Sequence, residues 1–301
     1  MIQLENLTKR YGDRTAVDDV TATICPGRVT GFLGPNGAGK STTMRMVMGF
    51  DRPDGGRATV AGREYRRLAA PLREVGALLD AKAAHPGRSA YHHLSALAAT
   101  HRIPRGRVDE VIGLAGLSSV AGKRVGEFSL GMGQRLGIAA ALLGDPGVLI
   151  LDEPVNGLDP EGVRWVRGLA RSLAAEGRTV FLSSHLMSEM AQVADHIIVL
   201  GRGRVLADAP VDEIIAGASR GSVRVRSPRL SELTAALDGT SVSIIDDDSA
   251  EVSGTTPEAI ADIALDLRIP VYELTPVDPT LEDAYLALTR DDVEYRTEGA
   301  R

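Results

Sequence analysis

The chain has 301 residues, of which 44% are hydrophobic and 25% are charged, a composition typical of globular proteins and not of disordered ones. Its length predicts one large domain and one small domain, and its net charge of -6 argues against a protein that mainly coats nucleic acid. The single cysteine, Cys25, excludes an internal disulfide, and with a charged N-terminus that lacks an apolar segment it predicts a cytosolic protein. No apolar run approaches the roughly 18 residues of a membrane-spanning helix.

The first two thirds of the chain alternate short apolar strands with helical stretches. Strands are predicted at residues 2–8, 16–24, 28–33, 74–79, 148–151, 179–182 and 196–200. Because continuous apolar strands need cover on both faces, this pattern predicts an α/β fold with a mostly parallel core sheet. The stretch 81–144 instead predicts a helical insertion, with helices at 89–102, 107–117 and 133–144.

A small polar joint, GASRGS, follows Ile215 and predicts a boundary between a domain of residues 1–217 and an accessory domain of residues 218–301. Beyond the joint we expect alternating strands and helices at 222–227, 229–238, 241–246, 249–253, 257–267, 270–275 and 280–289. The order βαββαβ is that of a ferredoxin-like α+β unit, with one helix added at its end.

A glycine-rich loop joins the strand at 28–33 to a predicted helix. It fits the pattern Gly, four spacers, Gly, Lys, Ser/Thr, and consists of Gly34, Pro35, Asn36, Gly37, Ala38, Gly39, Lys40, Ser41 and Thr42. Glycines allow successive backbone N–H groups to wrap phosphates at the start of a helix. In such a loop Lys40 reaches the β- and γ-phosphates of ATP, and the Ser41 hydroxyl binds Mg²⁺. A plain surface turn is the alternative, and the strand and helix on either side argue against it.

Two adjacent carboxylates, Asp152 and Glu153, end the apolar strand at 148–151. Ligands bind at the carboxyl ends of strands in α/β sheets, so the pair is predicted to lie at the nucleotide. We expect Asp152 to hold the Mg²⁺ shell and Glu153 to orient and deprotonate the attacking water. A strand that merely stops at charged residues is the alternative, and the phosphate loop upstream weighs against it.

The segment FSLGMGQR, residues 128–135, lies between these two motifs. With them it resembles the signature loop of the ATP-binding-cassette (ABC) family, which completes the ATP site of a facing subunit. The resemblance assigns Ser129 and Gly131 to the γ-phosphate of that subunit, while Leu130 and Met132 depart from the common LSGGQ form. Met132 is expected to belong to the same loop, which acts on the nucleotide of the facing subunit. Ser129 as a simple helix cap is the alternative.

Further matches follow in the order in which the family shows them. The resemblance implies that Tyr11 stacks on adenine, although a tyrosine in an exposed turn would be unremarkable by itself. It implies that Asn156 and Asp159, in the segment NGLD, belong to a loop at the subunit interface, and that His185 is the switch histidine at the γ-phosphate. Asp80 stands where the family generally places a glutamine that senses Mg²⁺; it is either a metal ligand or a solvated loop residue.

The resemblance covers residues 1–217 and implies the fold of a P-loop NTPase cassette with an antiparallel β subdomain. It implies an ATPase that uses ATP and Mg²⁺, closes as a homodimer and drives separate polytopic permease subunits, on the cytoplasmic face of the membrane. The closing segment LEDAYLALTR is similar to subunits that export drugs, antibiotics or lipids. The alternative, a soluble ABC ATPase acting on ribosomes or nucleic acid, fits less well with one uninterrupted cassette. A nucleotide-binding scaffold without turnover is argued against by Glu153 and His185.

Overall fold

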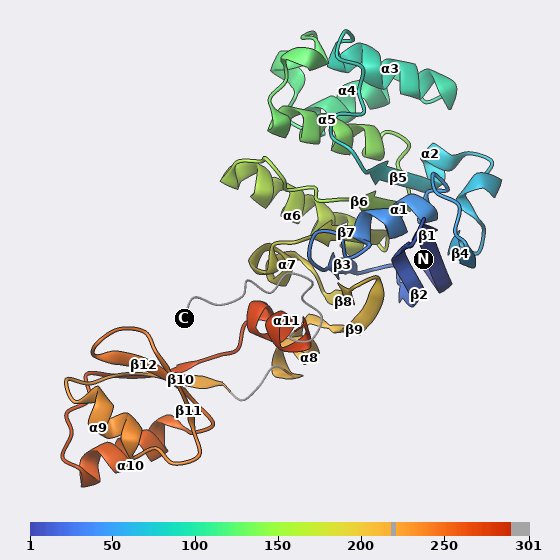
Figure 1. The fold of residues 1–301 in the computed structure, drawn as a ribbon. Coiled ribbons are helices and arrows are strands. Elements are labelled where there is room, and N and C mark those ends of the chain that lie inside the picture. Colours follow the sequence, from blue (N-terminus) through green and yellow to red (C-terminus); the bar gives the residue numbers. More distant parts are fainter. Residues whose placement is uncertain (218–220, 290–301) are drawn as a thin grey trace. The chain divides into compact units, whose positions relative to one another are not determined.

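The structure is a computed structural model that describes residues 1–217 and 221–289 (Figure 1). It contains two compact units, of which the first spans Met1–Val211 and the second begins at Asp212. We describe each unit by itself and refer to the first as the cassette.

The cassette is built on a six-stranded sheet with the strand order β5-β6-β7-β3-β8-β9. These strands span Val75–Leu78 (β5), Val148–Leu151 (β6), Thr179–Ser184 (β7), Val29–Leu33 (β3), His196–Gly201 (β8) and Arg204–Pro210 (β9). All neighbours are parallel except β8 and β9, and every residue of β3, β6, β7 and β8 is buried. The prediction of a mostly parallel, buried core sheet is confirmed. Because β3, β6 and β7 are parallel, the segments that follow them leave the sheet at one edge.

A second, antiparallel sheet has the order β2-β1-β4, with β1 at Ile2–Tyr11, β2 at Arg14–Ile24 and β4 at Gly55–Val60. The helix α1 (Lys40–Val47) contacts both β2 and β4, while α6 (Pro160–Ala175) and α7 (Met187–Val193) contact β3 and β7 of the core sheet. Strands β4 and β9 were not among the predicted strands. Both are edge strands with mixed burial, so neither carries a continuous apolar run.

The predicted helical insertion is present between β5 and β6. It contains α3 (Ala90–Thr100), α4 (Arg105–Leu114) and α5 (Leu130–Leu142), with short 3₁₀ turns at Ser118–Val120 and Val125–Glu127. Helix α5 begins three residues before its predicted start at 133. Short helical turns at Tyr65–Arg67 and Pro71–Glu74 (α2) precede β5.

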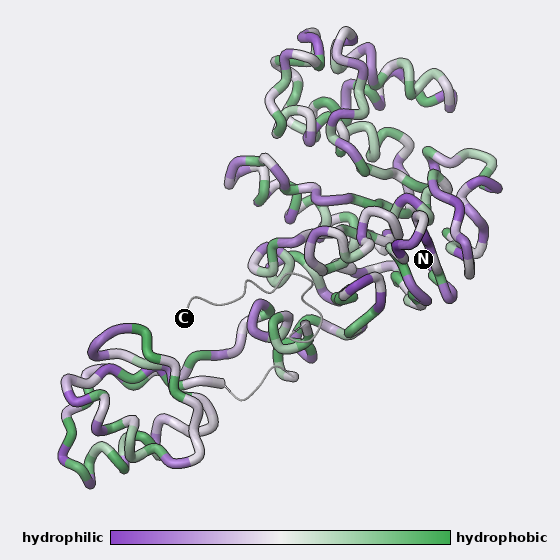
Figure 2. The backbone as a smooth tube through the Cα atoms, viewed as in Figure 1, coloured by the Kyte–Doolittle hydropathy of each residue, from purple (hydrophilic) through white to green (hydrophobic). Residues whose placement is uncertain are grey.

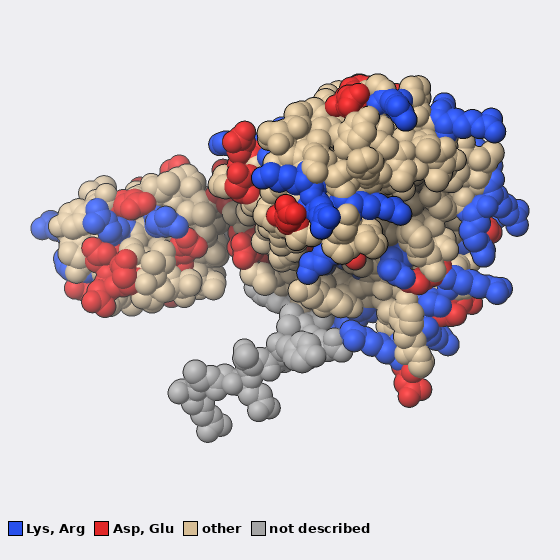
Figure 3. Space-filling model, turned by 90° about the horizontal axis from the view of Figure 1, so that it is seen from above, with Lys and Arg blue, Asp and Glu red and all other residues tan. Residues whose placement is uncertain are grey.

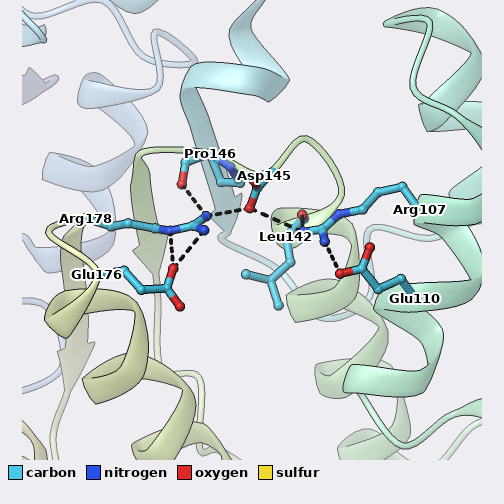
Figure 4. Close-up of polar contacts among 7 residues, drawn as sticks. All are labelled: Arg107, Glu110, Leu142, Asp145, Pro146, Glu176 and Arg178. Carbon is cyan, nitrogen blue, oxygen red and sulfur yellow. Dashed lines mark hydrogen bonds and ion pairs between the residues drawn. The ribbon is translucent and has the colours of Figure 1, made fainter.

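Asp145 connects the insertion to the core sheet at the turn between α5 and β6 (Figure 4). Arg107 of α4 donates to the Leu142 carbonyl at 2.8 Å, and its guanidinium lies 3.5 Å from Asp145 Oδ1. From the other side Arg178 donates to the same Oδ1 at 2.7 Å and to the Pro146 carbonyl at 3.1 Å. The hydrogen bond from Arg178 holds the pKa of Asp145 below its usual value.

The second unit has the predicted order βαββαβ. The helix α8 (Val211–Gly217) spans the boundary at Asp212. The elements that follow are β10 (Ser222–Arg226), α9 (Leu230–Ala235), β11 (Ser241–Ile244), β12 (Ser249–Ser253), α10 (Pro257–Asp266), β13 (Glu273–Val277) and the added helix α11 (Leu281–Thr289). The antiparallel sheet has the order β11-β12-β10-β13, so each βαβ crossover skips one strand, which confirms a ferredoxin-like unit. Val225, Val252 and Ile260 are among its fully buried residues. The strand predicted at 270–275 begins three residues later and ends two residues later, at Glu273–Val277, with Glu273 paired with Arg226.

None of the helices within 1–217 and 221–289 is long and apolar enough to cross a bilayer, and polar and apolar residues are interspersed along the chain (Figure 2). Lys and Arg side chains gather along one side of the larger unit in Figure 3, with acidic side chains among them. Several exposed arginines of the cassette are paired with carboxylates, as in Arg57–Glu5 and Arg63–Glu74.

Candidate nucleotide-binding site

The glycine-rich loop connects β3 to α1 and has the backbone that its sequence requires. Gly37 has φ of +85° and Gly39 has φ of +104°, both in the left-handed region that favours glycine. A Cβ atom on Gly39 would lie 2.5 Å from the Ala16 carbonyl oxygen, so a larger residue would also clash. The loop therefore wraps an open space in front of α1, as a phosphate-binding loop does.

Lys40 is the first residue of α1, and its side chain is only 6% exposed. Its ammonium donates to the Gly34 carbonyl at 2.6 Å and to the Pro35 carbonyl at 3.3 Å. It also lies 3.8 Å from Glu153 Oε1. Burial lowers the pKa of Lys40, while the negative charges of Glu153 and Asp152 act in the opposite direction. The loop thus points a largely desolvated cation at the cleft.

Glu153 is held by both its main chain and its side chain. It is a non-glycine residue with φ of +49°, a sparsely populated conformation. Its N–H donates to Ser183 Oγ at 2.9 Å, and its carbonyl accepts from the side-chain amide of Gln134 at 2.7 Å. Its carboxylate lies between Lys40 and His185, with Oε2 2.8 Å from His185 Nδ1. The structure therefore brings together three predicted site residues from β6, α1 and the end of β7.

Asp152 lies at the same edge of the sheet. The Ser183 hydroxyl donates to its Oδ1 at 2.5 Å. The negative charge of Asp152 opposes, without reversing, the lowering of the Lys40 pKa by burial.

A cleft of about 470 Å³ opens in front of the loop. It is lined by Tyr11, Arg14, Ala16, Pro35, Asn36, Gly37, Gly39, Lys40, Ser41, Thr42 and Glu153. Tyr11 is 49% exposed, its hydroxyl donates to Asp51 Oδ2 at 3.0 Å, and the Lys9 ammonium lies 5.3 Å from the ring centroid. A cleft lined by an aromatic ring as well as by a glycine loop with a cation suits a ligand with a flat base and a polyphosphate.

The residues of the signature loop do not line this cleft. Ser129 is exposed and forms the N-cap of α5, accepting a hydrogen bond from the Met132 N–H at 3.2 Å. A Cβ atom on Gly131 would lie 2.9 Å from the Gly157 carbonyl oxygen, and the side chain of Leu130, which is 49% exposed, packs on Gly157. The signature loop and the segment NGLD are therefore neighbours on one surface.

Asn156 and Asp159 flank Gly157 and are both exposed. The Asn156 N–H donates to the Glu153 carbonyl at 3.2 Å, and Asp159 caps α6 by accepting from the Gly162 N–H at 2.8 Å. The segment NGLD thus begins in contact with Glu153 and ends at the first turn of α6.

Asp80 is exposed and serves a local turn, in which its carboxylate accepts from the Lys82 N–H at 2.8 Å. In the part of the chain that the structure describes, no hydrogen bond or ion pair joins Asp80 to Lys40, Asp152 or Glu153, and no group of three or more His, Cys, Asp or Glu residues is arranged to hold a metal. A metal-binding role for Asp80 stays a prediction that the geometry does not favour.

The sequence analysis assigned no role to two residues that contact the site, Gln134 and Ser183. Gln134 belongs to the segment FSLGMGQR, and its nearly complete burial among apolar residues of α5 marks it as a polar residue with a specific partner. Ser183 is a small polar residue inside the apolar strand β7, and no pattern in the sequence indicates which strand lies beside it.

Comparison with known proteins agrees with this geometry. The family model described as "ABC transporter" matches residues 17–156. A model described as "AAA domain, putative AbiEii toxin, Type IV TA system" matches residues 123–191, and a model described as a domain of unknown function matches 221–282. The chain is 36% identical to the uncharacterized ABC transporter ATP-binding protein YhcH of Bacillus subtilis, over 98% of this chain and 97% of that protein. The chain belongs to the ABC transporter ATP-binding proteins.

Two further relatives of this ABC subunit carry informative names. The daunorubicin resistance ATP-binding protein DrrA3 of Streptomyces coeruleorubidus is 37% identical over 97% of this chain and 96% of its own. A solved dimeric bacterial ABC transporter cassette superposes with a TM-score of 0.64, at 25% identity, over 70% of this chain and 98% of its own. The ABC subunit is therefore a nucleotide-binding ATPase of this family, and no comparison favours a soluble ATPase that acts on ribosomes or nucleic acid.

Proposed function

We propose that this ABC subunit binds ATP in the cleft between Tyr11 and the loop 34–42 and hydrolyses it with Glu153 and His185. The observation that carries the proposal is the contact chain Lys40–Glu153–His185 beside a glycine loop whose backbone is open toward the cleft. A buried cation and a carboxylate that line the cleft, with an imidazole in contact with that carboxylate, suit a terminal phosphoryl group.

Each part of the cleft has a role in holding the nucleotide. The N–H groups of the loop and the start of α1 attract phosphate oxygens. Lys40 neutralises the β- and γ-phosphates, exchanging its hydrogen bonds to Gly34 and Pro35 for charge-assisted ones. The ring of Tyr11 provides a flat surface for adenine.

The residues present suit Mg²⁺, which prefers carboxylate and hydroxyl oxygens. Ser41 and Asp152 would hold it, and bound Mg²⁺ neutralises the charge that develops on the phosphate oxygens. Asp152 is already fixed by Ser183, whereas Asp80 is engaged in its own turn.

Glu153 is the base in this proposal. Its carboxylate orients a water molecule and takes a proton from it as the water oxygen bonds to the γ-phosphorus. The bond from that phosphorus to the β,γ-bridging oxygen breaks, and ADP is the leaving group. The bond to His185 Nδ1 fixes the carboxylate, and the main-chain bonds to Ser183 and Gln134 hold Glu153 in its left-handed conformation. The side chain of His185 contacts Glu153 and is 41% exposed.

We further propose that the site is completed by a second copy of the chain. Ser129, Gly131 and Met132 lie outside the cleft of their own chain, with Ser129 exposed beside Asn156 and the segment that ends at Asp159. A twofold interface would place this surface against the cleft of the partner and the reverse, which produces two equivalent sites. The dimer in the related cassette supports this arrangement.

We infer that ATP-driven closure of the dimer powers separate permease subunits, which dock on the helical insertion 81–144 near the Asp80 loop and hold the subunit at the cytoplasmic face of the membrane. Export of drugs, antibiotics or lipids is supported by the name of the relative DrrA3, which matches nearly full length. The residues from 218 onward are proposed to form an accessory domain that regulates the cassette.

Calorimetry with MgATP tests the proposed site directly. Lys40→Ala should lose nucleotide binding and turnover together, because a buried phosphate charge is left without its cation. Lys82→Ala, which removes an exposed lysine, is the matched control and should behave as the wild type. Unchanged affinity of Lys40→Ala would refute the phosphate loop.

A further inference from the structure

Ser183 makes contacts that no assigned role requires. It is the fifth of six residues in β7 and is fully buried. In the parallel register Leu182 lies opposite Leu151, the last residue of β6, so Ser183 lies beside the residues that follow β6. Its hydroxyl donates to Asp152 Oδ1 at 2.5 Å and accepts from the Glu153 N–H at 2.9 Å.

The direction of these bonds follows from the chemistry of a hydroxyl. A serine has one proton and two lone pairs. The Glu153 N–H can only donate, so it uses a lone pair of Ser183, and the single proton is free to go to Asp152. At 2.5 Å this is a charge-assisted bond to an ionised carboxylate. Among the described residues no other hydrogen bond is made to Asp152 Oδ1 or Oδ2, so Ser183 alone fixes the carboxylate and leaves Oδ2 for another ligand.

The second bond acts on a residue in a costly conformation. Glu153 has φ of +49°, and such a non-glycine residue persists only when its surroundings hold it. Its carbonyl is held by Gln134 and its N–H by Ser183. One buried hydroxyl therefore controls the orientation of both consecutive carboxylate residues.

We propose that Ser183 is a positioning residue for Mg²⁺-dependent ATP hydrolysis, setting the carboxylate of Asp152 through Oδ1 and the backbone of Glu153 through its N–H. This rests on the proposed roles of Asp152 and Glu153. Loss of a side chain that orients a metal-binding carboxylate typically costs about 10- to 100-fold in metal affinity or activity.

Ser183→Ala tests the proposal, with ATP binding measured by calorimetry as Mg²⁺ is varied and again in EDTA. We expect the Mg²⁺ concentration at half-maximal effect to rise about tenfold or more and kcat to fall by about as much, while affinity for metal-free ATP stays within about twofold. Ser183→Thr keeps the hydroxyl, and a small cavity lined by Ser183, Leu182 and Met190 lies beside it. The threonine variant should restore the wild-type Mg²⁺ dependence.

Ser227→Ala is the matched control for lost stability. Ser227 is also fully buried and makes two hydrogen bonds, to the Pro270 carbonyl and from the Arg229 N–H, but it lies in the second unit. The Ser227→Ala variant should lower the melting temperature without changing the Mg²⁺ dependence of ATP binding. If Ser183→Ala does not fold, Ser183→Cys replaces it, because a thiol is a weak donor and acceptor.

An unchanged Mg²⁺ requirement in the alanine or cysteine variant, or a threonine variant no better than alanine, would overturn the role of Ser183. That outcome is distinct from failure of the proposed function. In the latter case Lys40→Ala would still bind ATP, or Glu153→Gln would still hydrolyse it, whatever Ser183 does.

Discussion

Replacing Glu153 with glutamine isolates the role of one carboxylate. Glutamine has nearly the same size, and the bonds that hold this residue to Ser183 and Gln134 are made by its main chain, so they remain. What is lost is the negative charge 3.8 Å from the Lys40 ammonium and the group that accepts a proton beside His185. Binding of ATP should therefore persist, since Lys40 keeps its positive charge for the phosphates.

The expected loss is in turnover. A general base contributes about 10²- to 10⁴-fold, which corresponds to about 2.7 to 5.4 kcal/mol in the activation barrier. Phosphate release at saturating MgATP measures this loss, and size-exclusion chromatography with ATP should show a stable dimer that the wild type does not accumulate. Glu176→Gln is the matched control, because the Glu176 side chain is 50% exposed and its ion pair among the described residues is with Arg178.

Turnover of Glu153→Gln within about tenfold of the wild type, well short of a general base's contribution, would refute the assignment of the base. Absence of an ATP-dependent dimer in this variant would refute the proposed closure, even if hydrolysis were lost.

Two other changes test the dimer and the connection of the insertion. The Ser129→Arg variant should bind ATP in its own cleft yet stay monomeric and inactive. The control is Ser89→Arg, which likewise replaces the N-cap serine of a helix, α3, and should stay active. Wild-type turnover in Ser129→Arg would contradict a site completed by the second subunit. Asp145→Asn should lower the free energy of unfolding at pH 7 by at most about 1 kcal/mol, because Asp145 is 62% exposed. Because the pKa of Asp145 lies below the usual 3.8, urea unfolding should show the difference in stability between wild type and variant above pH 3.8. The difference should disappear as the pH falls through the lowered pKa. A difference independent of pH would exclude the ion pair.

The parts of the fold that could be predicted are those whose evidence is local in the chain. The loop 34–42 is contiguous with the strand before it and the helix after it, and two of its glycines, Gly37 and Gly39, have the positive φ angles that such a loop needs. Continuous apolar runs predicted β3, β6, β7 and β8 because these strands are buried on both faces. The edge strands β4 and β9 were missed, since half-exposed strands lack that pattern.

Local sequence patterns were enough to predict the loop 34–42, the acidic pair 152–153 and the helical insertion. Which residues come into contact depends on how the strands and helices pack. Glu153 contacts Gln134, 19 positions earlier, and Ser183, 30 positions later, through main-chain atoms that leave no sign in residue type. Such contacts depend on the order of β6 and β7 in the sheet and on their register, and a shift of one residue would turn Ser183 to the other face. Strand order is set by the packing of the whole core, which no local pattern encodes.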